Sequence, residues 1–197
     1  SWTYDGQAHS DAGFTVTYDG STITANEDGK YILPTGDEVK VTVTGSVTNV
    51  DEGEVENTAS YTLENQSSYN SVQVIPGKLS INPRPVTLTS ESASKAYDGT
   101  PLTKPDVEIG GDNFVPGEVE KVEATGSITN VGGPVANTIV ITPVEGGAYK
   151  ESNYAITKNE GTLTVTASEK AVVITAASNS WTYDGQAHSD AGFTVTY

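Results

Sequence analysis

The chain has 197 residues, with 10 Lys and Arg residues against 26 Asp and Glu residues, and a net charge of −16. An acidic surface repels nucleic acid and anionic membranes, and no apolar run reaches the roughly 20 residues of a membrane span, so we expect neither nucleic-acid binding nor membrane insertion. The absence of cysteine excludes disulfides, thiol nucleophiles and thiolate metal sites.

Apolar and polar residues alternate in short runs, and this pattern predicts β-strands with one buried and one wet face. Gly, Pro and Asn separate the runs, and no segment predicts a helix longer than a turn or two. In chain order the predicted strands are Val39–Thr44, Ala59–Leu63, Ser71–Ile75, Lys78–Ile81, Thr138–Thr142 and Thr162–Thr166. We therefore expect an all-β fold.

The segment 1–18 recurs without change as 180–197, so the sequence begins to repeat itself at position 180. A repeat of this length points to a window on a longer tandem array. Arrays of near-identical units are typical of structural or adhesive filaments, because each unit mainly contacts its neighbours. We therefore expect a structural or adhesive role and no enzymatic activity.

A weaker repeat lies inside this period and predicts two versions of one module. The paired motifs are Tyr4-Asp5-Gly6 with Tyr97-Asp98-Gly99, Thr44–Val50 with Thr125–Val131, Asn57-Thr58 with Asn137-Thr138, and Gly77–Ile81 with Gly161–Val165. The first two motifs begin at positions 4 and 44 in the first module and at positions 97 and 125 in the second, so the first module carries an insertion. We place this insertion between Tyr18 and Pro34.

The motifs predict a first module over 1–85, a complete second module over 86–170, and the start of the next copy over 171–197. Each is expected to be a small antiparallel β-sandwich-like module, Ig-like or β-grasp-like. Short joints, one stiffened by Pro83 and Pro85, favour an elongated arrangement. The predicted core of the second module is Val86, Leu88, Val122, Ile128, Ile139, Ile141, Tyr154, Ile156, Leu163 and Val165.

Several motifs resemble the tandem MBG/YDG-type repeat modules of large surface adhesins from Gram-positive-type bacteria. They are Gly161–Thr166, Ser94–Thr103, Gly126–Gly132, Ala136–Thr138 and Asn153–Thr157. The resemblance covers essentially the whole chain and is better in the second module, because the first departs from it at Gln7-Ala8-His9 and by its insertion. It implies an extracellular, cell-wall-attached stalk module at the cell surface, with host mucin or glycans as a further partner.

Other residues suggest local structure rather than chemistry. The Asp-Gly of each Tyr-Asp-Gly motif predicts a tight turn, with a cation or sugar ligand as the alternative reading of the Asp. The glycine of each Thr-Gly-Ser motif predicts a bulge or a close backbone approach. The acidic run Asp51–Glu56 lacks the ligand spacing of a calcium loop, so it predicts a solvated loop.

A catalytic or metal site is not expected. His9 and His188 occupy one repeat position, and no Gly-x-Ser-x-Gly motif is present. The alternative to a purely structural role is a glycan-binding module that uses exposed aromatic rings. Its candidate residues are Trp2, Tyr4, Tyr18 and Tyr31; for Trp2, capping the end of the sandwich is the competing reading.

The strand 171–175 predicts head-to-tail contact between copies. It aligns with Pro85–Thr89, which opens the second module, so the first module over 1–85 is expected to lack its opening strand. A missing strand leaves backbone N–H and C=O groups unpaired, and a neighbouring copy can supply one. The residues expected to complement the neighbour are Val172, Val173 and Ile174.

Overall fold

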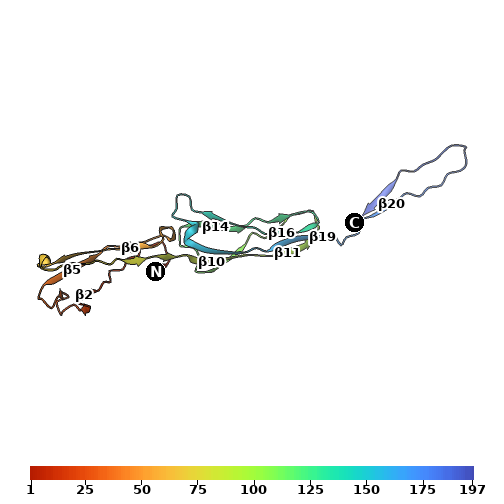
Figure 1. Ribbon diagram of the computed structural model, residues 1–197. Coiled ribbons are helices and arrows are strands. Elements are labelled where there is room, and N and C mark those ends of the chain that lie inside the picture. The colour runs from red at the N-terminus through yellow and green to blue at the C-terminus, as the bar shows by residue number, and fades with distance from the viewer. The chain divides into compact units, whose positions relative to one another are not determined.

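The computed structural model describes residues 1–197 and is built of β-strands (Figure 1). Strands hold 44% of the residues, and no α-helix is present. The helical segments are three short 3-10 turns, η1 (Val50–Glu52), η2 (Gln66–Ser68) and η3 (Glu151–Asn153). The all-β prediction is therefore confirmed. The grouping of the strands into two sandwich-like modules stays a prediction.

Two compact units divide the chain. Unit 1 holds Ser1–Leu88, Glu108–Val122 and Ile141–Asn159, and unit 2 holds Thr89–Val107, Glu123–Val140 and Glu160–Tyr197. The predicted module boundaries at 85/86 and 170/171 concern independent folding, so they stay predictions.

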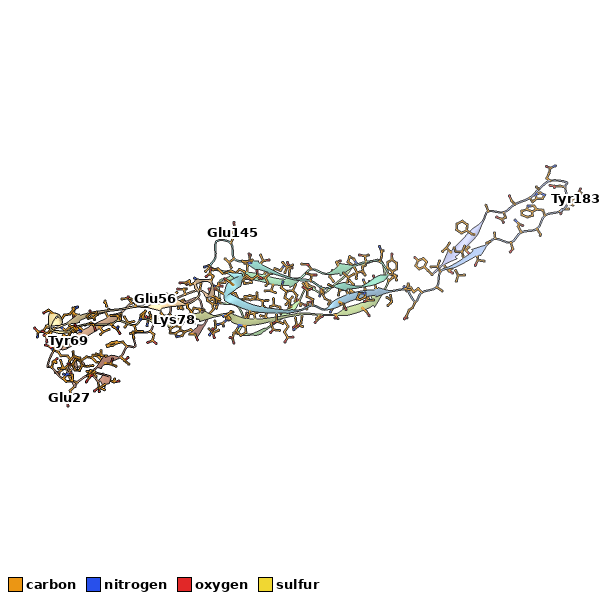
Figure 2. The ribbon with its side chains drawn as sticks, viewed as in Figure 1. Glu27, Glu56, Tyr69, Lys78, Glu145 and Tyr183 are labelled. Carbon is orange, nitrogen blue, oxygen red and sulfur yellow. The ribbon has the colours of Figure 1, made fainter.

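The strands that precede Pro83 form small sheets within unit 1. They are β1 (Trp2–Thr3), β2 (Val16–Tyr18), β3 (Ser21–Ile23), β4 (Tyr31–Ile32), β5 (Glu38–Val43), β6 (Val55–Asn57), β7 (Ala59–Leu63), β8 (Gly77–Leu79) and β9 (Ile81–Asn82). The sheet order is β4-β5-β7, with separate pairs β2-β3, β6-β8 and β1-β9. In the β6–β8 pair Glu56 lies opposite Lys78 (Figure 2).

The predicted alternation is seen clearly in the β5–β7 pair. Val41 lies opposite Tyr61, and both are half-buried, whereas their neighbours Lys40 and Thr62 are exposed. The predicted strands Val39–Thr44 and Ala59–Leu63 thus form within a residue of their expected bounds.

One predicted strand, Ser71–Ile75, is wrong. The segment 70–76 forms no strand, and Ile75 is 86% exposed. Alternation alone does not make a strand, because its backbone N–H and C=O groups also need a neighbouring strand. None of the chain's strands pairs with this segment.

The strands that follow Pro83, up to the last hairpin, form four further groups. They are β10 (Arg84–Ser90), β11 (Ala93–Ala96), β12 (Leu102–Thr103), β13 (Val107–Gly111), β14 (Val119–Ala124), β15 (Ser127–Ile128), β16 (Gly132–Ala136), β17 (Ile139–Pro143), β18 (Tyr154–Asn159) and β19 (Thr162–Thr166). The sheet orders are β13-β10-β18, β11-β19-β16, β12-β15 and β14-β17, and Figure 1 shows β11, β16 and β19 side by side.

The strand directions correct the expectation of purely antiparallel sheets. β1 pairs with β9 and β11 pairs with β19 in parallel, whereas β16 joins β19 antiparallel. Parallel partners need a long connection, and both parallel pairs join strands that are far apart in the sequence.

The predicted core residues all lie inside or at the edge of the packed interior. Six are buried and four are half-buried. The buried residues are Val86, Leu88, Ile139, Tyr154, Leu163 and Val165, and the half-buried ones are Val122, Ile128, Ile141 and Ile156. Strands that alternate apolar and polar residues bury one face, which explains this agreement.

The last two strands form a hairpin within unit 2. β20 (Val173–Ala176) runs antiparallel to β21 (Phe193–Thr196), with Ile174 opposite Val195 (Figure 1). The segment 193–196 repeats the segment 14–17. Val172, Val173 and Ile174 are exposed, and their proposed role in complementing a neighbour stays a prediction.

Candidate functional site

All three Tyr-Asp-Gly motifs form the same turn. In each, an Asp carboxylate oxygen accepts a hydrogen bond from the backbone N–H two residues later, at 2.9 Å, as in an Asx-turn. The following glycine has φ of +81°, +82° and +76°, a region that favours glycine. The three turns are Tyr4-Asp5-Gly6, Tyr97-Asp98-Gly99 and Tyr183-Asp184-Gly185. The turn prediction is therefore confirmed.

A neighbouring side chain completes each turn. Nε2 of His9 lies 2.9 Å from Oδ1 of Asp5, and the Nζ of Lys95 lies 2.8 Å from Oδ1 of Asp98. The Lys95 ammonium, with the backbone N–H and hydroxyl of Thr100, holds the pKa of Asp98 well below its usual range. These carboxylates thus form hydrogen bonds within their own turns. The Asp of the motif therefore has a structural role that requires no cation or sugar ligand.

The first turn ends in a buried contact that the sequence did not predict. The Tyr4 hydroxyl donates to Oε1 of Glu118 at 2.5 Å, and the Tyr154 hydroxyl donates to Oε2 of the same carboxylate at 2.6 Å. Tyr4 is 2% exposed and Glu118 is 4% exposed. We call these three residues, all of unit 1, the Glu118 site.

Aromatic rings surround the Glu118 site. The ring of Tyr154 contacts Tyr4 edge-on at 5.6 Å, Phe114 at 5.1 Å, and Tyr149 in a stack at 5.6 Å. Burial and the hydrogen bond to Glu118 raise the pKa of Tyr4 to about 12, and the same two causes raise the pKa of Tyr154. Both phenols therefore remain protonated donors at neutral pH.

A second polar contact of unit 1 joins residues 49–50 to Asn153, which directly precedes Tyr154 of the Glu118 site. Oδ1 of the buried Asn153 accepts a hydrogen bond from the Val50 backbone N–H at 2.9 Å, and its Nδ2 donates to Oδ1 of Asn49 at 2.9 Å. Arg84, at the start of β10, donates to the backbone oxygens of Tyr4 and Asn113. The opening strand β10 thus begins beside the Glu118 site.

A related but open arrangement surrounds Asp37, also in unit 1. The Tyr69 hydroxyl donates to Oδ2 of Asp37 at 2.5 Å, and Thr35 donates to the same oxygen at 3.0 Å. Asn65 donates to Oδ1 at 2.8 Å. These bonds, with that of Tyr69 the largest cause, lower the pKa of Asp37. We call Asp37, Tyr69, Thr35 and Asn65 the Asp37 site; Figure 2 labels Tyr69.

Asn57 fixes the Thr-Gly-Ser motif that begins at Thr44. Its Oδ1 accepts a hydrogen bond from the Gly45 N–H at 3.1 Å, and its Nδ2 donates to the backbone oxygen of Asp11 at 2.8 Å. A Cβ on Gly45 would lie 2.6 Å from Cα of Asn57, too close for any other residue. The predicted close approach at this glycine is confirmed.

Asn137 makes the same contacts in unit 2. Its Oδ1 accepts from the Gly126 N–H at 3.1 Å, and its Nδ2 donates to the backbone oxygens of Lys104 at 2.8 Å and Glu91 at 3.1 Å. A Cβ on Gly126 would lie 2.7 Å from Cα of Asn137. One polar network is therefore built twice from matching motifs.

The predicted aromatic residues lie in different ring contacts. Trp2 is half-buried and stacks on His9 at 5.0 Å, Tyr18 meets Tyr69 edge-on at 6.4 Å, and Tyr31 contacts Phe14 at 5.0 Å. Tyr4 is buried against Glu118, so its ring offers no face to a sugar and it leaves the set of glycan candidates. A hollow of about 300 Å³ along 109–122 is lined by none of the four.

Residues 51–54 of the acidic run Asp51–Glu56 are exposed, with Asp51 and Glu52 in η1, whereas its last two residues, Val55 and Glu56, begin β6. Glu52 accepts hydrogen bonds from the N–H groups of Thr48 and Asn49, and Glu54 pairs with Lys78 at 2.6 Å. The exposed residues 51–54 agree with the predicted solvated loop, whereas Val55 and Glu56 belong to a strand. The structure contains no group of three or more His, Cys, Asp or Glu side chains arranged to hold a metal ion.

Sequence reasoning missed Glu118 and Asp37, although a spacing signal marks both. Each acid follows a glycine and precedes a Thr-Gly-Ser motif by the same interval, from 37 to 44 and from 118 to 125. Without the fold, nothing in this spacing says that a tyrosine lies opposite.

No helix of the structure has the length and apolar character required to traverse a bilayer. Comparison of the chain with family models, with curated proteins and with solved structures finds no match.

Proposed function

We propose that this chain is a non-enzymatic structural repeat of an extracellular adhesin stalk or fibre, attached to a bacterial cell wall. It would consist of two tandem sandwich-like modules, repeated with the period that separates Ser1 from Ser180. Its role would be mechanical, which is to hold a distal part of the protein away from the cell surface.

The observation that carries this proposal is the network built twice around Asn57 and Asn137. The side chains that recur between 1–85 and 86–170 are engaged in turns, buried hydrogen bonds and close backbone approaches. In a structural repeat, the recurring residues are expected to stabilise the fold. They are not expected to line a shared binding pocket. The net charge of −16 favours solubility and mutual repulsion of extended copies.

We propose neighbouring copies as the partners, joined head to tail. The β20–β21 pair supports a register for this contact, because the segment 193–196 repeats the segment 14–17. Ile174 of one copy would lie opposite Val16 of the next, as it lies opposite Val195 here. Val172 and Val173 would extend the same strand over the neighbour.

Small-angle X-ray scattering of chains with one, two and four copies of the period tests the stalk. A rod requires the maximum dimension to grow nearly in proportion to copy number. A matched control carries a flexible Gly/Ser insertion after Lys170, and its dimension should grow roughly as the square root of copy number. Square-root growth without the insertion would contradict the proposal.

A glycan-binding module is the second candidate, favoured by half-buried rings at Trp2, Tyr18 and Tyr31. A half-exposed ring presents an apolar face on which a sugar can stack. Binding of the chain to a glycan array or to mucin, lost on Tyr18→Ala or Tyr31→Ala, would support this function. Tyr97→Ala is the matched control, because Tyr97 is exposed and outside the set.

A further inference from the structure

The three Tyr-Asp-Gly turns share one backbone geometry, but their tyrosines differ widely in exposure. Tyr4 is 2% exposed, Tyr97 is 41% exposed and Tyr183 is 94% exposed, and Figure 2 shows Tyr183 at the far end of its hairpin. The Tyr97 hydroxyl makes no hydrogen bond in the structure, whereas that of Tyr4 is bonded to Glu118. The turn is therefore complete without the contact, and the contact requires a carboxylate from elsewhere.

The Asp37 site matches the Glu118 site in its acid and in one tyrosine. Each acid follows a glycine at the same interval before a Thr-Gly-Ser motif. Each accepts a hydrogen bond from a tyrosine that directly follows a 3-10 turn, Tyr69 after η2 and Tyr154 after η3. The Asp37 site thus has counterparts of two members of the Glu118 site: Asp37 corresponds to Glu118, and Tyr69 corresponds to Tyr154.

The Asp37 site lacks what Tyr4 supplies at the Glu118 site. Oε1 of Glu118 accepts Tyr4, whereas the corresponding Oδ1 of Asp37 accepts the Asn65 amide alone and has a second lone pair. The ring of Tyr154 contacts three aromatic rings, and that of Tyr69 contacts one, Tyr18. The Asp37 carboxylate can therefore accept a hydrogen bond from a second phenol.

The glycine of each turn reports the same difference. A Cβ on Gly6 would lie 3.0 Å from Cγ1 of Val115, so the first turn is closely covered. A Cβ on Gly99 would meet nothing within 4 Å. The surface of the second turn is therefore open.

The second polar contact also has an unpaired counterpart. Val50, which donates to Asn153, is half-buried, whereas Val131 at the matching motif position is 58% exposed. Ser68 directly precedes Tyr69 as Asn153 precedes Tyr154, and its hydroxyl oxygen can accept the Val131 N–H. Two donors, the Tyr97 hydroxyl and the Val131 N–H, therefore have matching acceptors at Asp37 and Ser68.

We propose that the Asp37 site is the docking site for the Tyr97 turn of a second copy of this chain. The Tyr97 hydroxyl donates to the Asp37 carboxylate, and Val131 packs beside Ser68. The inference rests on the head-to-tail association proposed above and names its contact. It agrees with the proposed strand contact, because β20 would pair with the neighbour's β2, and Tyr18 of β2 meets Tyr69 of the Asp37 site.

Crosslinking of full-length chains tests the docking, since the protein has no cysteine of its own. A chain with Val131→Cys is mixed with a chain carrying Ser68→Cys and treated with a short bis-maleimide. A crosslinked dimer is expected. Ala148→Cys, at another exposed position, replaces Val131→Cys in the control and should give only background.

The dependence on the hydroxyl is then measured. Tyr97→Phe in the Val131→Cys chain should lower the crosslinking rate about tenfold or more, the usual loss for one hydrogen bond to a charged group. Asp37→Asn in the Ser68→Cys chain should lower it similarly, and combining the two should add little. Tyr183→Phe is the matched control and should have no effect.

Crosslinking at background level, or crosslinking indifferent to Tyr97 and Asp37, would overturn the inference. The stalk proposal is judged separately by scattering. Multi-copy chains that scatter as rods without this crosslink would remove the docking contact alone. Chains that crosslink but scatter as flexible coils would remove the stalk alone.

Discussion

The Glu118 and Asp37 sites of unit 1 each pair an acid with a tyrosine that follows a 3-10 turn, but they differ in burial. At Glu118 two tyrosine hydroxyls share a buried carboxylate, and at Asp37 one tyrosine, one threonine and one amide share a carboxylate in contact with water. The difference comes from Tyr4, because the corresponding oxygen of Asp37 accepts the Asn65 amide and no second tyrosine. A local motif therefore builds the acceptor, but burial depends on the partner that covers it.

The largest effect separating the two sites is expected from removing their acids. Glu118→Ala leaves two buried phenols without an acceptor, so it should lower the free energy of unfolding by about 3–4 kcal/mol. Asp37→Ala removes an acid whose partners reach water, so it should cost under about 1 kcal/mol. Urea unfolding followed by circular dichroism measures both. Equal losses would mean that the two sites do not differ in burial as described.

The networks at Asn57 and Asn137 are expected to respond alike, in contrast to the two acid sites. Gly45→Ala and Gly126→Ala each force a Cβ onto the Cα of the asparagine, and each should cost about 2–3 kcal/mol. Gly110→Ala is the control, because its Cβ would have 3.9 Å of clearance. Thermal unfolding would contradict the equivalence if only one network variant were destabilised.

Alkaline pH should affect the Glu118 site through its phenols. Because the folded pKa of Tyr4 is raised from near 10 to about 12, its contribution is fully present below pH 10 and is lost as the pH rises through 12. The shift corresponds to about 2–3 kcal/mol. Unfolding free energies measured from pH 9 to pH 12 should fall less steeply in Tyr4→Phe, and parallel curves would exclude this coupling.

The smallest change in stability is expected from an exposed ion pair near the Glu118 site. Lys150 and Asp51 form an ion pair at 3.0 Å, with both side chains 46% exposed. Because water screens such pairs, Lys150→Met should change the free energy of unfolding by about 0.5 kcal/mol or less. If Lys150→Met lowered the free energy of unfolding as much as Glu118→Ala, this ion pair would be as important for stability as the Glu118 site, contrary to the prediction.

The sequence was sufficient where structure follows from local pattern. Alternation located β5, β7 and β19, and Asp-Gly located the three turns. It was insufficient where a residue depends on a distant partner. Ser71–Ile75 alternates as well as any strand but has no neighbour, and Glu118 looks like any surface acid until Tyr4, far away in the sequence, reaches it. Parallel pairing of β11 with β19 was likewise not encoded locally.

The β20–β21 hairpin has a consequence for the kinetics of assembly. Because the segment 193–196 is the segment 14–17 again, β20 can form the same backbone ladder with its own chain or with another. The choice then depends on effective concentration, since a partner tethered by a short flexible loop competes at about the millimolar level. Exchange between molecules is therefore favoured where copies are crowded side by side, and a dilute chain keeps its hairpin closed.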